Sequence, residues 1–345
     1  MGTPSPSLEA SARAGEVQPL QLDLGLWPGL RLVDLSEMRR KTEKLRAGSR
    51  APNTRRAYES DWRHFTDWCE SFPASPRCLP ADPATVVDYI SAHAGKLAVA
   101  TIRRRLSSIA RQHLSAGLAN PAESDVVREV LKGLRRSDRR RPAAKRAIGV
   151  AELRAMVRAV RRNESEALGV RDAALLLLGF AGGFRRSELV GLDLADVEAV
   201  KRRGVLLHVR WSKTDQVGRG RTVGVPFGQH EDTCPVRALR AWLAVRGKHD
   251  GPLFVGARGD CVLTRERLSD RAVARLVKRA AELVGLDARE FSGHSLRAGL
   301  VTSAKEAGVS DTDIMHVTGH KSVQTLARYV RPSSALNVAP VAGLL

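Results

Sequence analysis

One uninterrupted apolar stretch constrains the fold of this chain more than any other feature of its sequence. Residues 173–184, AALLLLGFAGGF, contain no charged side chain and lie between the pairs Arg171-Asp172 and Arg185-Arg186. A helix needs about 20 apolar residues to cross a bilayer, so this run of roughly a dozen is too short. The run therefore predicts a helix that is buried inside a folded domain, and no membrane partner.

Length and charge narrow the range of functions. The chain has 345 residues, 43% of them hydrophobic, which is long enough for two domains with separate cores. Lys and Arg number 57 against 37 Asp and Glu, a formal net charge of +20 that favours a polyanionic partner, with nucleic acid first and an anionic membrane surface second. Only 4% of the residues are aromatic, so stacking on unpaired bases is poorly supported and double-stranded DNA is the better partner.

The cysteines do not indicate a metal site or a disulfide framework. Cys69, Cys78, Cys234 and Cys261 form no C-x-x-C pair and have no histidine at ligand spacing. The N-terminus lacks a basic start followed by an apolar core, so no secretory signal is visible. We therefore expect a cytoplasmic, nucleoid-associated protein.

The N-terminal half predicts a small helical domain. Residues 1–48 have little periodicity and suggest a flexible tail with a short helix around Leu35 to Leu45. Between residues 49 and 138, apolar side chains recur at helical spacings of three and four. The expected helices begin near Asn53 and Thr101 and cover Pro83 to His93 and Ser124 to Leu134.

Basic residues gather in this half and after it. On the helix from Thr101, apolar side chains share one side while arginines spread over the others. Residues 128–146 contain nine positive and two negative side chains, with Pro142 interrupting helical continuity. We interpret residues 139–147 as a basic linker, either a strap across DNA phosphates or a solvated charged hinge. The candidate DNA contacts, whether to groove or phosphate, are Arg103, Arg104, Arg105, Arg139, Arg140 and Arg141.

Residues 148–345 predict a second domain that is mainly α with a small antiparallel sheet. Gly204 to Trp211 and Arg221 to Pro226 have the composition of a β-hairpin. Helical patterns cover the rest of the domain, at Glu152 to Val160, Asp172 to Phe180, Pro235 to Val245, Ser269 to Val284, His294 to Ala307, Thr312 to Val317 and Val323 to Val330.

Four short motifs in this domain carry side chains suited to phosphate chemistry. The first, AGGFRRSEL, uses glycines to turn Arg185 out of the core. The second, GHSLRAG, places His294 and Arg297 three apart on one helical face. The third, GHKS, offers His320 and a capping serine, and the fourth is Tyr329 on the helix that follows. Taken singly, Arg185 is typical of a surface ion pair and Tyr329 of a packing residue.

Together, in this order and spacing, the motifs resemble the tyrosine recombinase (phage integrase) family. The resemblance covers about Ile148 to Tyr329, and residues 49–138 look like the core-binding domain of that family. The stretch FSGHSLRAG is most similar to the Cre-like branch. The resemblance implies six catalytic residues, namely Arg185, Lys213, His294, Arg297, His320 and Tyr329.

Two of the implied roles have alternatives. The family uses a lysine in a β-hairpin turn, and Lys213 is the best placed, although Lys201, Arg219 and Arg221 lie nearby. Glu188, in the R-x-S-E pattern, either holds the site in shape or caps a helix.

The chemistry of these residue types agrees with the implied roles. The phenol of Tyr329, with a reference pKa near 10, needs a proton acceptor, which His294 or His320 supplies. Two guanidiniums hold the non-bridging oxygens of a phosphodiester, and an ammonium protonates the departing 5′ oxygen. The motifs contain no carboxylate cluster for Mg²⁺ and no P-loop, so no cofactor is expected. The product is a 3′-phosphotyrosyl link.

The resemblance also implies assembly, with a dimer on one DNA site and a homotetramer on two. The apolar segment Leu336 to Leu345 is expected to pack on a neighbouring subunit, unless it is an ordinary frayed terminus. Two other functions remain open, a type IB topoisomerase that relaxes DNA and a catalytically silent DNA-binding protein of the same fold.

Overall fold

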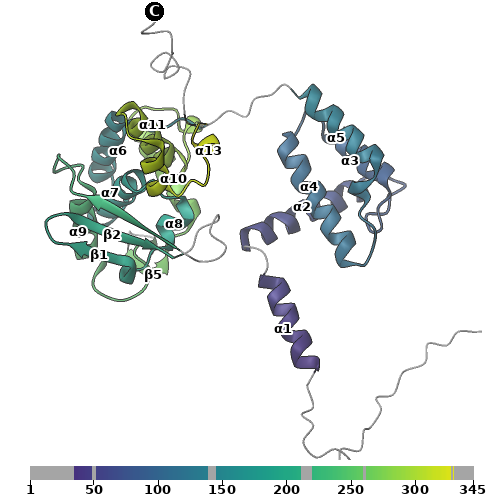
Figure 1. Ribbon diagram of the computed structural model, residues 1–345, viewed down its shortest axis with the longest axis horizontal. Helices are drawn as coiled ribbons and strands as arrows, with labels where there is room; N and C mark the ends of the chain where they lie inside the picture. The colour runs from purple at the N-terminus through teal and green to yellow at the C-terminus, as the bar shows by residue number, and fades with distance from the viewer. Residues whose placement is uncertain are drawn as a thin grey trace, which may run out of the picture. The chain divides into compact units, whose positions relative to one another are not determined.

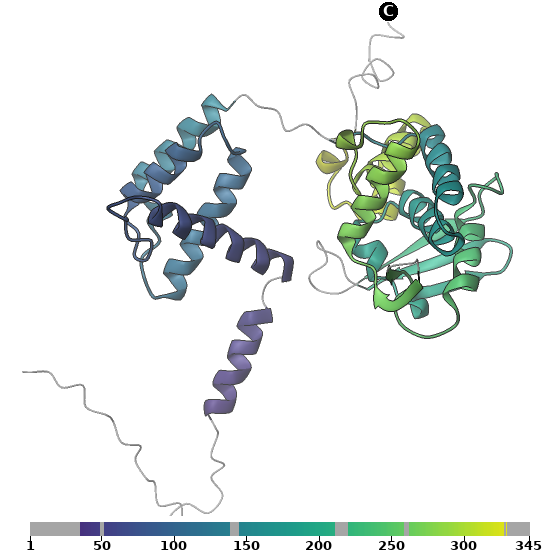
Figure 2. The same cartoon turned by 180° about the vertical axis from the view of Figure 1, so that it is seen from behind.

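The computed structural model describes residues 35–48, 52–138, 145–210, 220–258, 262–327 and 329. The chain divides into two compact units, Met1–Arg141 and Pro142–Leu345, and each is described by itself (Figures 1 and 2). Several residues singled out in the sequence lie outside the described residues, namely Arg139, Arg140, Arg141, Lys213 and the segment 336–345.

The N-terminal unit is helical, as predicted. Its core forms where α2 packs on α4 and α3 on α5, and Phe65, Tyr89, Ile102 and Ile109 are fully buried there. The first helix differs, because the side chains of residues 35–45 are all exposed. The elements are α1 (Leu35–Gly48), α2 (Pro52–Glu70), α3 (Pro83–His93), α4 (Val99–Ser115), the 3₁₀ turn η2 (Pro121–Glu123) and α5 (Asp125–Ser137).

The C-terminal unit is a layer of helices with two small antiparallel sheets. The expected helices are all present, and the short helix α8 is an addition. The helices are α6 (Val150–Asn163), α7 (Glu166–Ala181), α8 (Arg186–Gly191), α9 (Pro235–Arg246), α10 (Asp270–Leu283), α11 (Ser295–Glu306), α12 (Asp311–Thr318) and α13 (Val323–Ala327). Short 3₁₀ turns, η3 (Leu194–Asp196) and η4 (Ala288–Glu290), precede β1 and α11.

Helix α7 lies at the centre of this unit. Residues 173–178 are at most 3% exposed, and α7 contacts α6, α9 and α11 (Figure 1). A helix that is apolar on all sides is buried on all sides, which confirms the expectation from the apolar run. No helix in the described part of the chain is long and apolar enough to span a membrane.

The predicted hairpin is present and belongs to a three-stranded sheet. Strands β1 (Val197–Val200), β2 (Gly204–Val209) and β3 (Arg221–Pro226) pair in sequence order, with Val209 opposite Arg221. Val223 and Val225 point into the core while their neighbours are exposed, as a sheet with one solvated face requires. A second sheet, β4 (Val255–Arg258) with β5 (Val262–Arg267), was not predicted.

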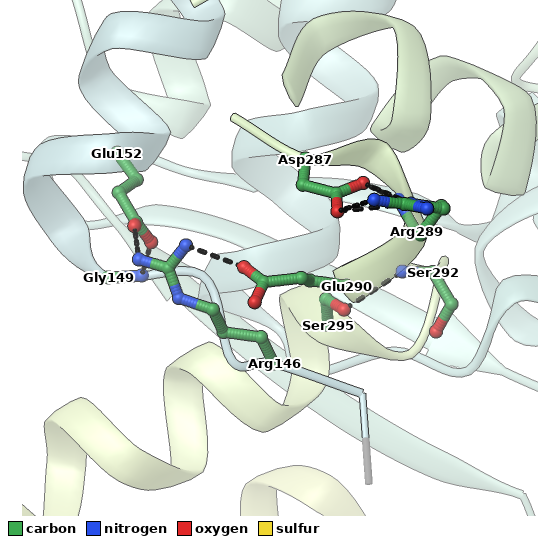
Figure 3. A network of polar contacts seen from close by, with 8 residues as sticks. All are labelled: Arg146, Gly149, Glu152, Asp287, Arg289, Glu290, Ser292 and Ser295. Carbon is green, nitrogen blue, oxygen red and sulfur yellow. Dashed lines mark hydrogen bonds and ion pairs between the residues drawn. The ribbon is translucent and has the colours of Figure 1, made fainter. Parts of the chain in front are cut away.

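The residues that enter the C-terminal unit are bonded to the segment that precedes α11. The Arg146 guanidinium lies between the carboxylates of Glu152 and Glu290 (Figure 3), and its backbone N–H donates to the Glu290 carbonyl over 2.8 Å. The N–H of Ile148 donates to the Ser295 carbonyl over 3.2 Å. Gly299 permits this close approach, since a Cβ there would lie 2.3 Å from the Ile148 carbonyl oxygen.

Candidate active site

Five of the six predicted catalytic side chains are described, and the structure brings them into one cluster. Tyr329 is the common neighbour: its ring centroid lies 5.7 Å from that of His294 and 5.5 Å from that of His320. Arg185 and Arg297 are close enough to act electrostatically on both imidazoles. The five residues come from four segments, the start of α8, the start of α11, the turn after α12 and the turn after α13.

The turn between α7 and α8 presents Arg185. Helix α7 stops at two glycines, and Gly183 adopts a φ of 55° that a side chain would strain. Arg185 is then the N-cap of α8: its backbone N–H donates to Glu188 Oε2 over 3.0 Å, and its Nη1 donates to Glu188 Oε1 over 2.5 Å. Glu188 therefore fills both roles that the sequence left open, the helix cap and the support of the arginine.

Glu188 holds a second guanidinium, that of Arg221 at the start of β3. Arg221 Nη2 donates to Glu188 Oε2 over 2.7 Å, and Nη1 donates to the Val317 carbonyl. Burial acts to raise the pKa of Glu188, but the charge of Arg221 and the bonds from Arg185 outweigh it and hold that pKa below its usual range. The sequence offered Arg221 only as an alternative hairpin cation, whereas the structure makes it part of the site's framework.

Arg297 lies deepest in the site, with 1% of its surface exposed. Its Nη1 donates to the carbonyls of Gly183 and Thr318, over 2.7 and 2.6 Å. Its Nη2 is buried and has no hydrogen-bond partner among the described residues. Burial and the nearby Arg185 lower the pKa of Arg297 to about 10, so it stays charged at neutral pH. A buried cationic donor without a partner is suited to an anionic oxygen.

His294 forms the direct contact with the phenol. Its Nε2 lies 2.6 Å from the Tyr329 hydroxyl oxygen, and with an unprotonated Nε2 the hydroxyl is the donor. Burial, then the charges of Arg297, Arg185 and Arg186, lowers the pKa of His294. At neutral pH the ring is therefore uncharged and able to accept the phenolic proton.

His320 stands on the turn that ends α12. Gly319 closes that helix in the left-handed conformation, with a φ of 69°. His320 is 8% exposed, and burial followed by the charges of Arg297 and Arg185 lowers its pKa to about 4. The predicted cap on the next helix is confirmed, because Ser322 Oγ accepts from the Thr325 N–H over 3.3 Å.

The sequence placed Tyr329 on helix α13, but in the structure this residue follows the end of the helix. The helix ends at Ala327, and the Tyr329 N–H donates to the carbonyl of Leu326, three residues back, over 3.0 Å. A bond to the third preceding residue closes a turn instead of extending an α-helix, which needs the fourth. The apolar stripe that begins at Val323 predicted a longer helix. Leu326 is buried as that stripe requires, but Val323 is 54% exposed.

The three described DNA-contact candidates lie in the N-terminal unit, on α4, in different surroundings. Arg103 is exposed, with no ion pair to another residue among those described. Arg104 forms a bidentate pair with the buried Asp61, over 2.7 and 2.9 Å. Arg105 is mostly buried and donates to the Tyr89 hydroxyl over 3.1 Å. Of the three, Arg103 alone has a guanidinium free of these internal contacts.

The described residues contain no group of three or more His, Cys, Asp or Glu side chains that could hold a metal ion. Within the described ranges, the charged groups of the cluster are guanidiniums and one carboxylate that is already bonded to two of them. The arrangement can bind an anion and move a proton between a phenol and an imidazole.

Comparisons with known proteins agree with this chemistry. The model of the phage integrase family matches residues 148–335. An integrase/recombinase XerD homologue of Selenomonas ruminantium is 37% identical over 295 residues, which cover 85% of this chain and 84% of the relative. The recombinase Cre of Escherichia phage P1 is 26% identical over 294 residues, covering 79% and 84%. The identity with the XerD homologue is thus higher than that with Cre.

Solved structures show the same fold. XerH recombinase, in a post-cleavage complex with a palindromic difH substrate, has a TM-score of 0.57 at 18% identity and covers 79% of this chain and 75% of its own. A lambda integrase tetramer bound to a Holliday junction has a TM-score of 0.53 at 18% identity, covering 89% and 84%.

The fold and the site define a class of enzyme, the recombinases that break and rejoin DNA strands through a tyrosine. This chain belongs to the phage integrase family.

The position of Glu188 generates a prediction about stability. Glu188→Ala leaves two guanidiniums without their shared carboxylate, so we expect the free energy of unfolding to fall by about 3 to 5 kcal/mol in urea denaturation. Since the folded-state pKa of Glu188 lies below its ordinary 4.5, its contribution is complete above that pH and is lost as the pH falls through the folded value.

The matched control is Glu198→Ala, which removes a carboxylate that is 60% exposed and paired with His208. Its cost should stay below about 1 kcal/mol. Equal costs for the two variants would mean that Glu188 does not hold the arginines.

Proposed function

We propose that the protein is a site-specific DNA recombinase that cleaves and rejoins duplex DNA with Tyr329 as nucleophile. The observation that carries this proposal is the 2.6 Å contact between the Tyr329 hydroxyl and His294 Nε2, in a cluster that also contains Arg297 and Arg185. A phenol beside a neutral imidazole and surrounded by cations is an activated oxygen nucleophile.

The cleavage step follows from these positions. The Tyr329 oxygen attacks the scissile phosphorus as its proton passes to His294 Nε2, and the bond from phosphorus to the 5′ oxygen breaks. The 5′ oxygen takes a proton, for which we propose Lys213 as donor. The step leaves a 3′-phosphotyrosine and a free 5′-hydroxyl, and attack by the 5′-hydroxyl of a partner strand reverses it without loss of phosphodiester energy.

The arginines act on the charge that develops during attack. The buried Nη2 of Arg297 has no hydrogen-bond partner in the described part of the chain, and we propose it as a donor to a non-bridging oxygen. Arg185 keeps one side in contact with Glu188 and is 21% exposed, so the rest of its fork is open to the second oxygen. His320 completes the contacts around the phosphate.

We also propose a dimer on one DNA site and a homotetramer on two, acting on nucleoid DNA in the cytoplasm. The lambda integrase tetramer on a Holliday junction supports an assembly of this kind. The apolar segment 336–345 is the part of the sequence that we expect to pack on a neighbour. For DNA contact in the N-terminal unit, Arg103 is the candidate that the contacts of α4 favour.

Tyr329→Phe tests the chemistry. A nicked suicide duplex, from which the short 5′ strand diffuses away, traps the covalent intermediate on a denaturing gel. Wild-type protein should give a band of protein covalently attached to the 3′ end of the cleaved strand, whereas Tyr329→Phe should give none. The DNA affinity of the variant should stay within about twofold of the wild type, since only the hydroxyl is lost. Covalent product from the variant would exclude Tyr329 as nucleophile.

The two neighbouring arginines of α4 provide a matched pair for DNA binding. Arg103→Ala should weaken binding and reduce the slope of log affinity against log salt by about 1, with unfolding unchanged. Arg104→Ala should instead lower the stability of the N-terminal unit, because the buried Asp61 loses its bidentate partner and keeps only the longer pair with Arg105, at 3.8 Å. The opposite pattern in fluorescence anisotropy and urea denaturation would assign the DNA contact to Arg104.

Two-site assembly is tested by deletion of residues 336–345. We expect the truncated chain to bind single sites normally and to lose tetrameric synapsis, as followed by native gel and by strand exchange between two labelled duplexes. Unchanged synapsis would exclude this segment as the intersubunit contact. Relaxation of supercoiled plasmid without any strand exchange by wild-type protein would favour the topoisomerase alternative.

A further inference from the structure

The turn that carries His320 contains a hydroxyl group whose single hydrogen is already used. Thr318 is fully buried, and its Oγ1 lies 2.6 Å from the Ile314 carbonyl oxygen. A carbonyl oxygen only accepts, and a hydroxyl has one hydrogen, so that hydrogen lies between Oγ1 and Ile314. Two acceptor oxygens at this distance without a hydrogen between them would repel each other.

Thr318 Oγ1 therefore has only lone pairs to offer its other neighbour. That neighbour is His320 Nδ1, 2.8 Å away and equally buried within the turn. A bond at this distance requires a hydrogen on Nδ1, which then donates to Oγ1. In an uncharged ring the second nitrogen, Nε2, must consequently be bare.

The surroundings of His320 favour the uncharged ring in the DNA-free protein. Among the residues that the structure describes, the groups that face it are three guanidiniums, one imidazole and one phenol, and the carboxylate of the cluster is bonded to two of those guanidiniums. Cations at this range disfavour another positive charge. The facing groups are Arg185, Arg221, His294, Arg297 and Tyr329.

We propose that Thr318 fixes the tautomer of His320, so that the uncharged ring presents Nε2 as a hydrogen-bond acceptor and donates to a phosphate oxygen only after taking up a proton from solution. Thr318 is thus a positioning residue that acts through His320. The tautomer is a property of the protein alone, whereas the coupling to phosphate rests on the proposed function.

The consequence is a proton linked to engagement of the phosphodiester. The negative charge of the phosphodiester offsets the guanidiniums and favours the charged imidazolium form of His320. In that form Nδ1–H still donates to Thr318 Oγ1, while the new Nε2–H donates to the phosphate. One proton enters the complex with the scissile phosphate. The rate of cleavage should fall as the pH rises through the pKa that His320 has in the complex.

The tautomer is read directly from ¹⁵N-histidine spectra of the full-length, DNA-free protein, with the His320 signals assigned by their loss in His320→Gln. The expected result at neutral pH is a hydrogen on Nδ1 and none on Nε2. Thr318→Ser, which keeps the hydroxyl, should give the same pattern, and Thr318→Val, which removes it, should populate the Nε2–H form. A hydrogen on Nε2 in the wild-type ring overturns the proposal.

The coupling is read from single-turnover cleavage of the suicide duplex as a function of pH. Wild type and Thr318→Ser should lose about tenfold in rate per pH unit along the alkaline limb, because one proton is required. In Thr318→Val the fall in cleavage rate on the alkaline side should begin at least one pH unit higher, since an uncharged ring can now donate through Nε2. An unchanged limb in a folded Thr318→Val protein overturns the coupling.

The two measurements separate this inference from the proposed function. Absence of covalent product from wild-type protein would contradict the proposed function, while the spectra would still decide the tautomer. Should Thr318→Val fail to fold, the wild-type spectra and the Thr318→Ser profile still decide between a bare and a protonated Nε2.

Discussion

The candidate active site depends on one buried carboxylate. Glu188 accepts hydrogen bonds from Arg185 and Arg221 and a third from the peptide that starts α8. Without this negative charge, guanidiniums so near the buried Arg297 would repel one another. The carboxylate also joins the strand β3 to the α7–α8 turn, and through the Arg221 bond to Val317 it reaches the end of α12. Segments far apart in sequence are thereby fixed around one point.

Burial and the same charges decide which groups carry protons. Burial first, and then the cationic cluster, lowers the pKa of both imidazoles, so His294 and His320 stay uncharged to lower pH than a free histidine would. The guanidinium of Arg297 keeps its charge even with a pKa lowered to about 10. An arrangement of this kind is suited to an anion and at the same time leaves an uncharged base beside the phenol.

Local patterns in the sequence were sufficient for much of the fold. The apolar run at 173–178 is the buried centre of α7, and Arg221 to Pro226 forms β3. Both were predictable because an element buried on all sides is apolar throughout, and a strand buried on one face alternates between apolar and polar residues. Strands β1 and β4 were missed because four residues are too few to show an alternation, and β5 was missed because its six residues do not alternate between buried and exposed positions. They exist through pairing, which sequence periodicity does not report.

Motifs in the sequence named residues that the structure brings together, but they did not reveal the network that holds those residues. Arg185, His294, Arg297, His320 and Tyr329 could be named from motifs, since each motif is local. The role of Arg221 could not be predicted in this way. It depends on the strand register that places Arg221 opposite Val209 and on a hydrogen bond to a carbonyl 96 residues away. The short turn that carries Tyr329 was likewise hidden behind an apolar stripe that continues past the end of α13.

The attachment of Arg146 has a mechanical meaning for the catalytic loop. Arg146 is held between the carboxylates of Glu152 and Glu290 (Figure 3). Lys145 Nζ donates to the Arg289 carbonyl over 2.6 Å. Because Arg289 and Glu290 precede His294 by only a few residues, a displacement of the chain where it enters this unit is passed directly to the segment that carries the imidazole.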